Sequence, residues 1–219
     1  LISIDPFGLC CESDEIRSFS EDTGVAVLSD SACSIGALDA SGRPGGHAGR
    51  LATFSFHPRK VVTTGEGGAL VCDDDELRDR LRELRNHGQG QGRFQRVVTN
   101  ARLGECAAAM GCAQLARLDA MLGERRLLAE GYEQRLDGLV RAGLVELQQV
   151  PEGALPARQS FCINLAGAAT GRRAALIAHL DAAGIQAGVG TFSFCELELH
   201  RGAGEAPVSR NLHENCVSL

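Results

Sequence analysis

Aromatic residues are scarce in this sequence of 219 residues: they make up 4% of it, and tryptophan is absent. So few aromatic side chains disfavour an aromatic-rich β-sandwich. Glycine is frequent instead, with 27 residues, and 44% of the chain is apolar. A chain of this length and apolar content can bury a sizeable core. We therefore expect an α/β fold in which strands and helices alternate and tight turns join them.

Long apolar runs and clusters of basic residues are also missing. The sequence contains no stretch of about 18 apolar residues without charge, which a membrane-spanning helix would need. The net charge of -6 is spread along the chain. Nucleic acids and anionic membranes require a one-sided basic surface instead. We therefore expect no nucleic-acid partner and no membrane association.

The sequence contains nine cysteines but no C-x-x-C pair. An odd count in a chain of this length argues against a disulfide framework, so we expect free thiols and a cytoplasmic location. The adjacent Cys10 and Cys11 cannot by spacing alone form a zinc or iron–sulfur site. The histidines His47, His57 and His87 lack the spacing of metal ligands on one face. We therefore expect no metal centre and do not favour a metal hydrolase.

The two ends of the sequence suggest a fragment. Leu1 stands within an expected strand, and the chain stops at Leu219 without a polar tail or a helix-ending residue. We expect a chain that lacks its N-terminal part and its extreme C-terminus. Within it we predict two domains: residues 1–120 as the C-terminal portion of a large domain with a mostly parallel sheet, and residues 121–219 as a linker helix and a small α+β domain.

The first thirty residues have the pattern of a β-α-β unit. We expect a strand at 1–4, a helix over about 12–21 that ends near Gly24, and a buried strand at Val25–Leu28. This order is typical of a parallel sheet covered by helices. Asp30 then lies at the carboxyl end of a strand, which is where open α/β sheets gather their ligands.

A second clear helix follows the strands expected at 51–56 and 68–72. Asp73 is its expected N-cap and Glu76 completes a capping box. Three leucines at helical spacing form its expected buried stripe: Leu77, Leu81 and Leu84.

The rest of the chain divides into a glycine-rich loop, two helices in succession and a smaller α+β region. The expected ranges are a mobile loop at 88–99, helices between 103 and 136, strands at 145–150 and 161–165, and a helix at 172–183.

Lysine is the scarcest charged residue: of the 22 basic residues, Lys60 is the only lysine. A guanidinium group stays protonated in a protein, whereas a lysine amine can lose its proton and attack a carbonyl. The alternative is a surface lysine that escaped a bias toward arginine. The neighbouring residues decide between the two, and they favour a Schiff-base lysine that holds pyridoxal 5'-phosphate (PLP).

Two neighbours supply the other groups that PLP needs. Ser55 ends a strand before the loop that carries Lys60, and its hydroxyl and nearby backbone amides could hold a phosphate. Asp30, at the end of the neighbouring strand, could pair with a pyridinium nitrogen and keep the ring an electron sink. Taken singly, Asp30 could be a cap and Ser55 a turn former. Their order along the chain favours the interpretation that both residues bind PLP.

The motifs around these residues resemble the DegT/DnrJ/StrS family of sugar aminotransferases. The resemblance spans nearly the whole chain and implies a fold-type-I PLP-dependent transferase in which Lys60 forms the internal aldimine. Its segments follow one another in the family's order: Leu28–Ala37, Ser55–Lys60, Thr63–Gly68, Leu84–Gly88 and Gln114–Asp119.

The resemblance also implies a role for each site residue. Asp30 pairs with the pyridine nitrogen, and Ser55 binds the phosphate. Cys33 occupies a place often held by Gln or His, where it would contact the cofactor hydroxyl. Asn100 would reach the phosphate in a partner subunit, which implies a homodimer with a shared active site. The alternative for Asn100 is a simple N-cap of the following helix.

The implied reaction moves an amino group from an amino acid, usually glutamate, to a keto sugar nucleotide, as in the biosynthesis of polysaccharide or antibiotic sugars. Lys60 would also move a proton at the substrate Cα. Related sugar dehydratases replace this lysine with histidine, so Lys60 argues against that reaction. A truncated, inactive chain stays open as an alternative. A nucleotide-binding module at Gly88–Gly92 is disfavoured because this run follows a helix instead of a strand.

Overall fold

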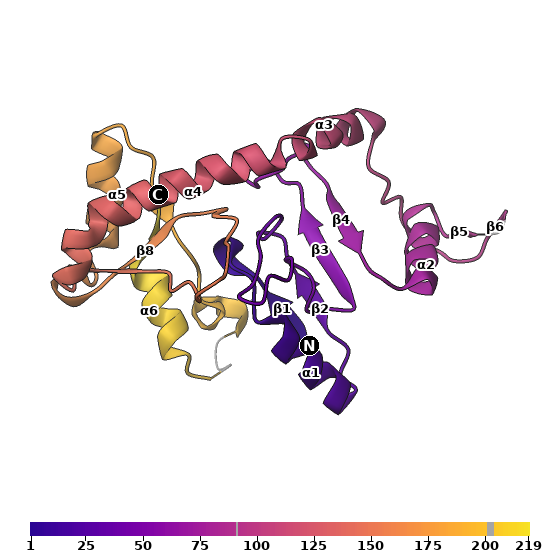
Figure 1. The fold of residues 1–219 in the computed structure, drawn as a ribbon, viewed down its shortest axis with the longest axis horizontal. Coiled ribbons are helices and arrows are strands. Elements are labelled where there is room, and N and C mark those ends of the chain that lie inside the picture. The colour runs from indigo at the N-terminus through magenta and orange to yellow at the C-terminus, as the bar shows by residue number, and fades with distance from the viewer. Residues whose placement is uncertain (91, 201–203) are drawn as a thin grey trace. The chain divides into compact units, whose positions relative to one another are not determined.

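The computed structural model describes residues 1–90, 92–200 and 204–219. The chain forms two compact units (Figure 1). The first consists of Leu1–Arg125 and Val150–Gln159, and the second of Arg126–Gln149 and Ser160–Leu219. The predicted domain boundary at residue 120 stays a prediction, because compactness does not test whether a unit folds alone. In the described part of the chain, no helix is long and apolar enough to cross a membrane.

The first unit contains a mostly parallel four-stranded sheet, as predicted. Its strands lie in the order β1 (Ile2–Ile4), β2 (Leu28–Asp30), β3 (Leu51–Ser55) and β4 (Gly68–Val71). The first three are parallel, and β4 is antiparallel to β3. This mostly parallel sheet, with an α-helix between β1 and β2, confirms the α/β class.

The strand expected at Val25–Leu28 begins later, at Leu28. The preceding helix α1 runs from Ser13 to Thr23 and ends at Gly24, whose φ of 69° reverses the chain. The residues after Gly24 lead the chain back to the sheet before the strand begins, and Val25 among them is 40% exposed. The apolar run alone could not locate this boundary.

The start of α1 is stabilised by a residue from a distant loop. Glu12 at the N-cap makes no side-chain cap, but the carboxylate of Asp39 accepts a hydrogen bond from the backbone N–H of Ser13 at 3.2 Å. Burial would raise the pKa of Asp39, yet hydrogen bonds from Ser13, Arg43 and Ser41 hold that pKa below its usual value. Asp39 thereby joins α1 to the loop between β2 and β3.

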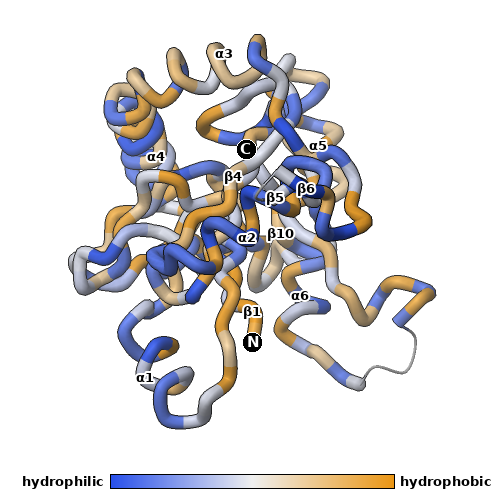
Figure 2. The backbone as a smooth tube through the Cα atoms, turned by 90° about the vertical axis from the view of Figure 1, so that its right-hand side faces the viewer, coloured by the Kyte–Doolittle hydropathy of each residue, from blue (hydrophilic) through white to orange (hydrophobic). Residues whose placement is uncertain are grey.

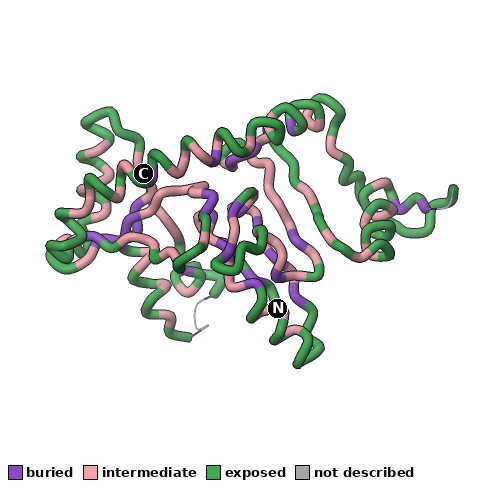
Figure 3. The backbone as a smooth tube through the Cα atoms, in the orientation of Figure 1, coloured by how far each residue is buried: buried purple, intermediate pink, exposed green. Residues whose placement is uncertain are grey.

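Helix α2 (Asp75–Arg85) is capped by Asp74, so the predicted capping box at Asp73 and Glu76 is wrong by one residue. The carboxylate of Asp74 accepts a hydrogen bond from the N–H of Leu77 at 2.9 Å. The leucine stripe at Leu77, Leu81 and Leu84 is half-buried instead of buried. Figures 2 and 3 show a mainly hydrophilic helix without buried residues.

The capping difference gives a direct test. We expect Asp74→Ala to lower the free energy of unfolding by about 1 kcal/mol, because the N–H of Leu77 loses its acceptor. Asp73→Ala is the matched control: this neighbour is exposed, and its loss should cost less than about 0.5 kcal/mol. Urea titrations of both variants, followed by circular dichroism, measure the difference. Equal losses would contradict the observed cap.

Part of the segment predicted as a mobile loop forms a small hairpin, so the loop prediction is wrong for Gln89–Gly90 and Arg93–Phe94, while the predicted mobility stays a prediction. Strand β5 (Gln89–Gly90) pairs with β6 (Arg93–Phe94). Gly88, with a φ of 70°, lies in the turn that leads from α2 into β5, and a Cβ there would meet the carbonyl oxygen of Arg96 at 2.3 Å. Gln91, in the run considered for nucleotide binding, lies outside the described residues.

Two helices in succession follow the hairpin, as predicted: α3 (Glu105–Leu115) and α4 (Leu118–Arg141). Helix α3 is hydrophobic along most of its length (Figure 2). The core of the first unit includes Leu122 from α4, together with Cys10, Ala37, Val61 and Ala157. Burial raises the pKa of the Cys10 thiol to about 12, so this side chain is a neutral, apolar member of the core.

The second unit has the predicted α+β character and contains an antiparallel sheet. Its strands lie in the order β7 (Val145–Leu147), β8 (Cys162–Leu165), β10 (Cys216–Ser218) and β9 (Gly188–Val189). Helices α5 (Arg173–Ala182) and α6 (Pro207–Asn215) accompany it. Its main hydrophobic cluster has four buried members, all from strands: Val145, Ile163, Leu165 and Val217.

Short 3-10 helices complete the chain. They span Pro6–Gly8 (η1), Gly167–Ala169 (η2), Phe194–Glu196 (η3) and Glu198–His200 (η4).

Candidate active site

The three parallel strands of the first unit end together. The register pairs Ile4 with Asp30 and Asp30 with Thr53. The pairing continues beyond the strands, since the N–H of Asp5 donates to the carbonyl of Asp30 at 3.1 Å and that of Ser31 to the carbonyl of Thr53 at 3.0 Å. The loops after β1, β2 and β3 therefore leave the sheet along one edge, here called the carboxyl edge.

Asp30 is the last residue of β2, as predicted, and is half-buried. Its Oδ1 accepts a hydrogen bond from the N–H of Ala32 at 3.2 Å, which shapes the turn that follows. Both interpretations of Asp30 from the sequence, a helix or turn cap and a ligand at a strand end, are compatible with this geometry. Its predicted contact with a pyridine nitrogen stays a prediction.

Ser55 ends β3 and begins the turn that carries Lys60. The Ser55 hydroxyl accepts a hydrogen bond from the N–H of His57 at 3.3 Å, and the carbonyl of His57 accepts one from the N–H of Lys60 at 2.9 Å. The next two residues, Val61 and Val62, are buried and fix the far end of the loop. Lys60 is thus held on a short loop with an anchor at each side.

The amine of Lys60 points to the neighbouring loop. Its Nζ lies 3.0 Å from the Sγ of Cys33, a residue of the turn after Asp30. This contact joins the loops after β2 and β3 and brings two predicted site residues together. The sequence predicted a contact between Cys33 and the cofactor, and that contact stays a prediction. It did not predict the contact with Lys60.

A buried carboxylate that sequence reasoning missed supports this arrangement. Asp5, only 3% exposed, follows β1 at the carboxyl edge. Its side chain accepts hydrogen bonds from the hydroxyls of Ser31 at 2.8 Å and Ser34 at 2.7 Å, and from the N–H of Cys11 at 3.0 Å. Asp5 therefore fixes the turn on both sides of Cys33. The rule that selected Asp30, a polar residue at a strand's carboxyl end, could have selected Asp5 as well.

After the Lys60 loop the chain turns at Gly67, and neighbouring side chains come close to the Cα of this glycine. Gly67 has a φ of 142°, and a Cβ there would lie 2.9 Å from Thr64 Oγ1 and 2.8 Å from a methyl of Leu103. The Gly67 carbonyl accepts a hydrogen bond from the N–H of Phe56 at 2.9 Å, and the Thr64 hydroxyl donates one to the carbonyl of Glu66 at 2.7 Å. Only glycine fits this position, which holds β4 against the start of the lysine loop.

Asn100 lies on a separate exposed segment. Its Oδ1 accepts hydrogen bonds from the backbone N–H and the Nε of Arg102, at 3.1 and 3.2 Å. Helix α3 has Gly104 at its N-cap, so the alternative that Asn100 caps this helix is wrong. Its predicted role in a partner subunit stays a prediction.

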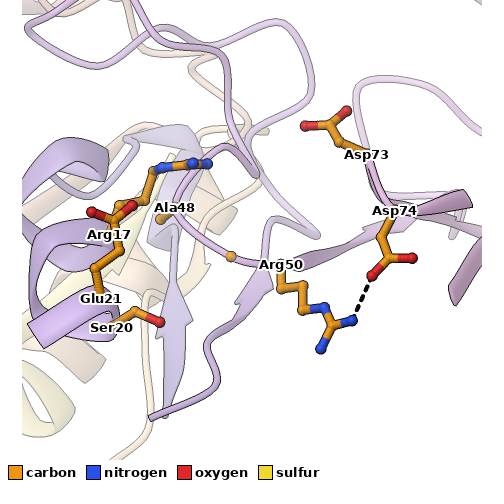
Figure 4. Close-up of a pocket in the computed structure, with 8 residues that line it drawn as sticks. Arg17, Ser20, Glu21, Ala48, Arg50, Asp73 and Asp74 are labelled. Carbon is orange, nitrogen blue, oxygen red and sulfur yellow. Dashed lines mark hydrogen bonds and ion pairs between the residues drawn. The ribbon is translucent and has the colours of Figure 1, made fainter. Parts of the chain in front are cut away.

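A polar cavity of about 320 Å³ lies at the end of the strands opposite the carboxyl edge (Figure 4). Arg50, which precedes β3, forms an ion pair there with Asp74, which follows β4. Arg17 and Glu21 of α1 also line it. Since β4 is antiparallel to β3, this cavity borders the amino ends of the parallel strands, away from Lys60. Open α/β sheets bind ligands at the carboxyl ends of their strands, so the carboxyl edge, and not this cavity, is the candidate active site.

Known proteins resemble this chain over most of its length. The sequence model of the DegT/DnrJ/EryC1/StrS aminotransferase family matches residues 1–219. A GDP-perosamine synthase of Caulobacter vibrioides is 34% identical over 192 residues, which cover 85% of this chain and 50% of the synthase. A dTDP-3-amino-3,4,6-trideoxy-alpha-D-glucose transaminase of Streptomyces venezuelae is 35% identical over 217 residues, covering 97% of this chain and 54% of the transaminase.

The fold agrees with these sequence matches. The crystal structure of S. venezuelae DesV in complex with a ketimine intermediate superposes with a TM-score of 0.86 and 30% identity, covering 100% of this chain and 58% of DesV. The chain spans about half the length of the curated relatives named here. The match over all residues, the relatives and the fold lead to one conclusion: the chain belongs to the DegT/DnrJ/EryC1/StrS aminotransferase family.

Proposed function

We propose that this chain is part of a PLP-dependent aminotransferase that moves an amino group from an amino acid, with glutamate as the expected donor, to a keto sugar nucleotide. The contact between Lys60 and Cys33 carries the proposal, because it brings the only lysine over the carboxyl end of β2, where Asp30 stands. The names of the relatives, a perosamine synthase and a deoxy-amino-sugar transaminase, favour a sugar nucleotide as acceptor.

The residues at the carboxyl edge fit PLP. Asp30 is half-buried, and its Oδ1 accepts a hydrogen bond from the N–H of Ala32. A carboxylate so placed can accept a hydrogen bond from a protonated pyridine nitrogen through Oδ2. The Ser55 hydroxyl, now an acceptor for His57, can donate to a phosphate. When bound, PLP supplies the electron sink that amino-group transfer requires.

Lys60 has two tasks in the proposed reaction. Its amine, when neutral, would hold the cofactor by its aldehyde carbon. When free of the cofactor, the same amine would serve as the base and acid that moves a proton from the donor Cα. A short loop anchored by Ser55 and by buried Val61 suits both tasks, because it lets the side chain move while its backbone stays fixed.

We further propose a homodimer with a shared active site, to which Asn100 of one subunit contributes. Asn100 lies on an exposed segment, as a residue that serves a neighbouring subunit must. We also propose that the protein works in the cytoplasm, where free cysteines persist: all nine cysteines of the chain are free thiols.

The amino-donor half of the reaction tests the proposed function without knowledge of the sugar. Protein loaded with PLP and given L-glutamate alone should release 2-oxoglutarate in an amount that matches the bound cofactor and then stop, because no acceptor is present. L-glutamine and L-aspartate serve as comparison donors. Release without PLP, or none from any donor by protein shown to hold the cofactor, would contradict the proposal.

A further inference from the structure

The proposed reaction gives no role to the contact between the amine of Lys60 and the thiol of Cys33. The two atoms lie 3.0 Å apart, and both side chains are half-buried. A thiol and an amine at this distance are two nucleophiles that cannot react with each other. Oxidation changes this, because a sulfenic acid is an electrophile that a nearby nitrogen can attack.

The surroundings hold both side chains in place. On the Cys33 side, Asp5 binds the hydroxyls of Ser31 and Ser34 at 2.8 and 2.7 Å. On the Lys60 side, the amide of Gln159 donates to the carbonyl of Arg59 at 3.1 Å. These bonds fix the backbone on both sides of the contact, so an intermediate formed at Cys33 meets Lys60 without a rearrangement.

We propose that Cys33 and Lys60 form a redox-sensitive pair, in which hydrogen peroxide converts the contact into a covalent sulfur–nitrogen bond. In the first step the Cys33 sulfur attacks the peroxide. The S–O bond forms, the O–O bond breaks, and the sulfur is oxidised to a sulfenic acid while water leaves. In the second step the neutral amine of Lys60 attacks that sulfur, the S–N bond forms, and the S–O oxygen leaves as a second water.

A dithiol reductant reverses the modification. It cleaves the S–N bond, returns the thiol of Cys33 and the amine of Lys60, and is itself oxidised to a disulfide. The modification needs only the contact of the two side chains. Its consequence, the loss of the amine that attaches PLP, rests on the proposed function.

The rest of the chain offers little competition for this bond. Lys60 is the only lysine, and the N-terminal amine of Leu1 donates to the carbonyl of Ala26 at 2.9 Å. Burial raises the pKa of Cys10 to about 12 and that of Cys11 to about 11, so both thiols stay protonated near neutral pH and react slowly with peroxide. A lysine-linked product therefore identifies Lys60 as the nitrogen, and the sequence of the cross-linked peptide identifies the sulfur.

Amine labelling after peroxide treatment tests the proposal. The full chain without PLP is exposed to hydrogen peroxide, quenched with catalase, denatured and treated with an amine-reactive acylating reagent. We expect labelling of Lys60 to be lost, and to return when a dithiol reductant precedes the label. Digestion should also yield a cross-linked peptide that joins Cys33 to Lys60 and weighs about 2 Da less than the two peptides together.

Two variants make the test specific. Cys33→Ser removes the sulfur and should keep full labelling of Lys60 after peroxide, while Cys106→Ser, which removes an exposed thiol of helix α3, should behave as the wild type. Unchanged labelling of the wild-type protein, equal loss in Cys33→Ser, or absence of the cross-linked peptide would each overturn the proposal. Capture of PLP by untreated protein is measured separately, so a failure of the proposed function is distinguishable from a failure of the redox pair.

Discussion

We expect that replacing Lys60 with arginine abolishes covalent capture of PLP. Arginine keeps the positive charge and most of the length of the side chain, but its guanidinium stays protonated and does not attack an aldehyde. Because the chain has no other lysine, no second side-chain amine can take over. After incubation with PLP, reduction with borohydride and digestion, mass spectrometry should find a pyridoxyl group on the Lys60 peptide of the wild type and on no side chain of the variant.

A displaced lysine provides the matched control. The exposed neighbour Arg59 is changed to lysine in the Lys60→Arg variant, which moves the amine by one residue while the composition stays the same. The contact with Cys33 places the Lys60 amine at the carboxyl edge, and an exposed side chain at position 59 lacks that placement. Capture by the displaced lysine as efficient as in the wild type would contradict a specific site. Competition by L-glutamate before reduction adds a second check.

The features that the sequence predicted correctly depend on short segments. Asp30 and Ser55 at strand ends, and the two helices after residue 103, follow from apolar periodicity and turn residues within about ten positions. The cap at Asp74 shows the limit of this reasoning. Three consecutive aspartates, Asp73 to Asp75, offered almost the same local pattern, and the middle one is the cap.

The features that the sequence did not predict depend on distant partners. Asp5 and Ser34 are 29 residues apart, and Cys33 and Lys60 are 27 apart, so their pairing follows from the sheet register instead of any local pattern. Strand β10 lies between β8 and β9 with only three residues, Cys216–Ser218. So short a strand has no measurable period, and its position becomes clear only from its partners.

We expect Asp5→Ala to lower the free energy of unfolding more than Asp74→Ala or Asp14→Ala. The change leaves the hydroxyls of Ser31 and Ser34 and the N–H of Cys11 without their acceptor in a site where Asp5 is 3% exposed. Buried donors without partners cost about 1–3 kcal/mol each, and water entering the space offsets part of the sum. We expect a loss of about 4 kcal/mol in the free energy of unfolding, measured by urea titration with circular dichroism.

Two comparisons separate the hydrogen bonds of Asp5 from its charge. Asp14→Ala removes an acidic residue of helix α1 whose ion pair with Arg43 is exposed, and should cost less than about 1 kcal/mol. Asp5→Asn keeps the size of the side chain and one acceptor oxygen. Its loss in the free energy of unfolding should lie between those of the two alanine variants. Equal losses in the free energy of unfolding for Asp5→Ala and Asp14→Ala would show that the effect comes from the change in net charge and not from the hydrogen bonds of Asp5. A large loss for Asp5→Ala combined with a weaker peroxide effect on Lys60 labelling would show that the carboxylate also positions Cys33, because it is the acceptor that fixes the turn on either side of that thiol.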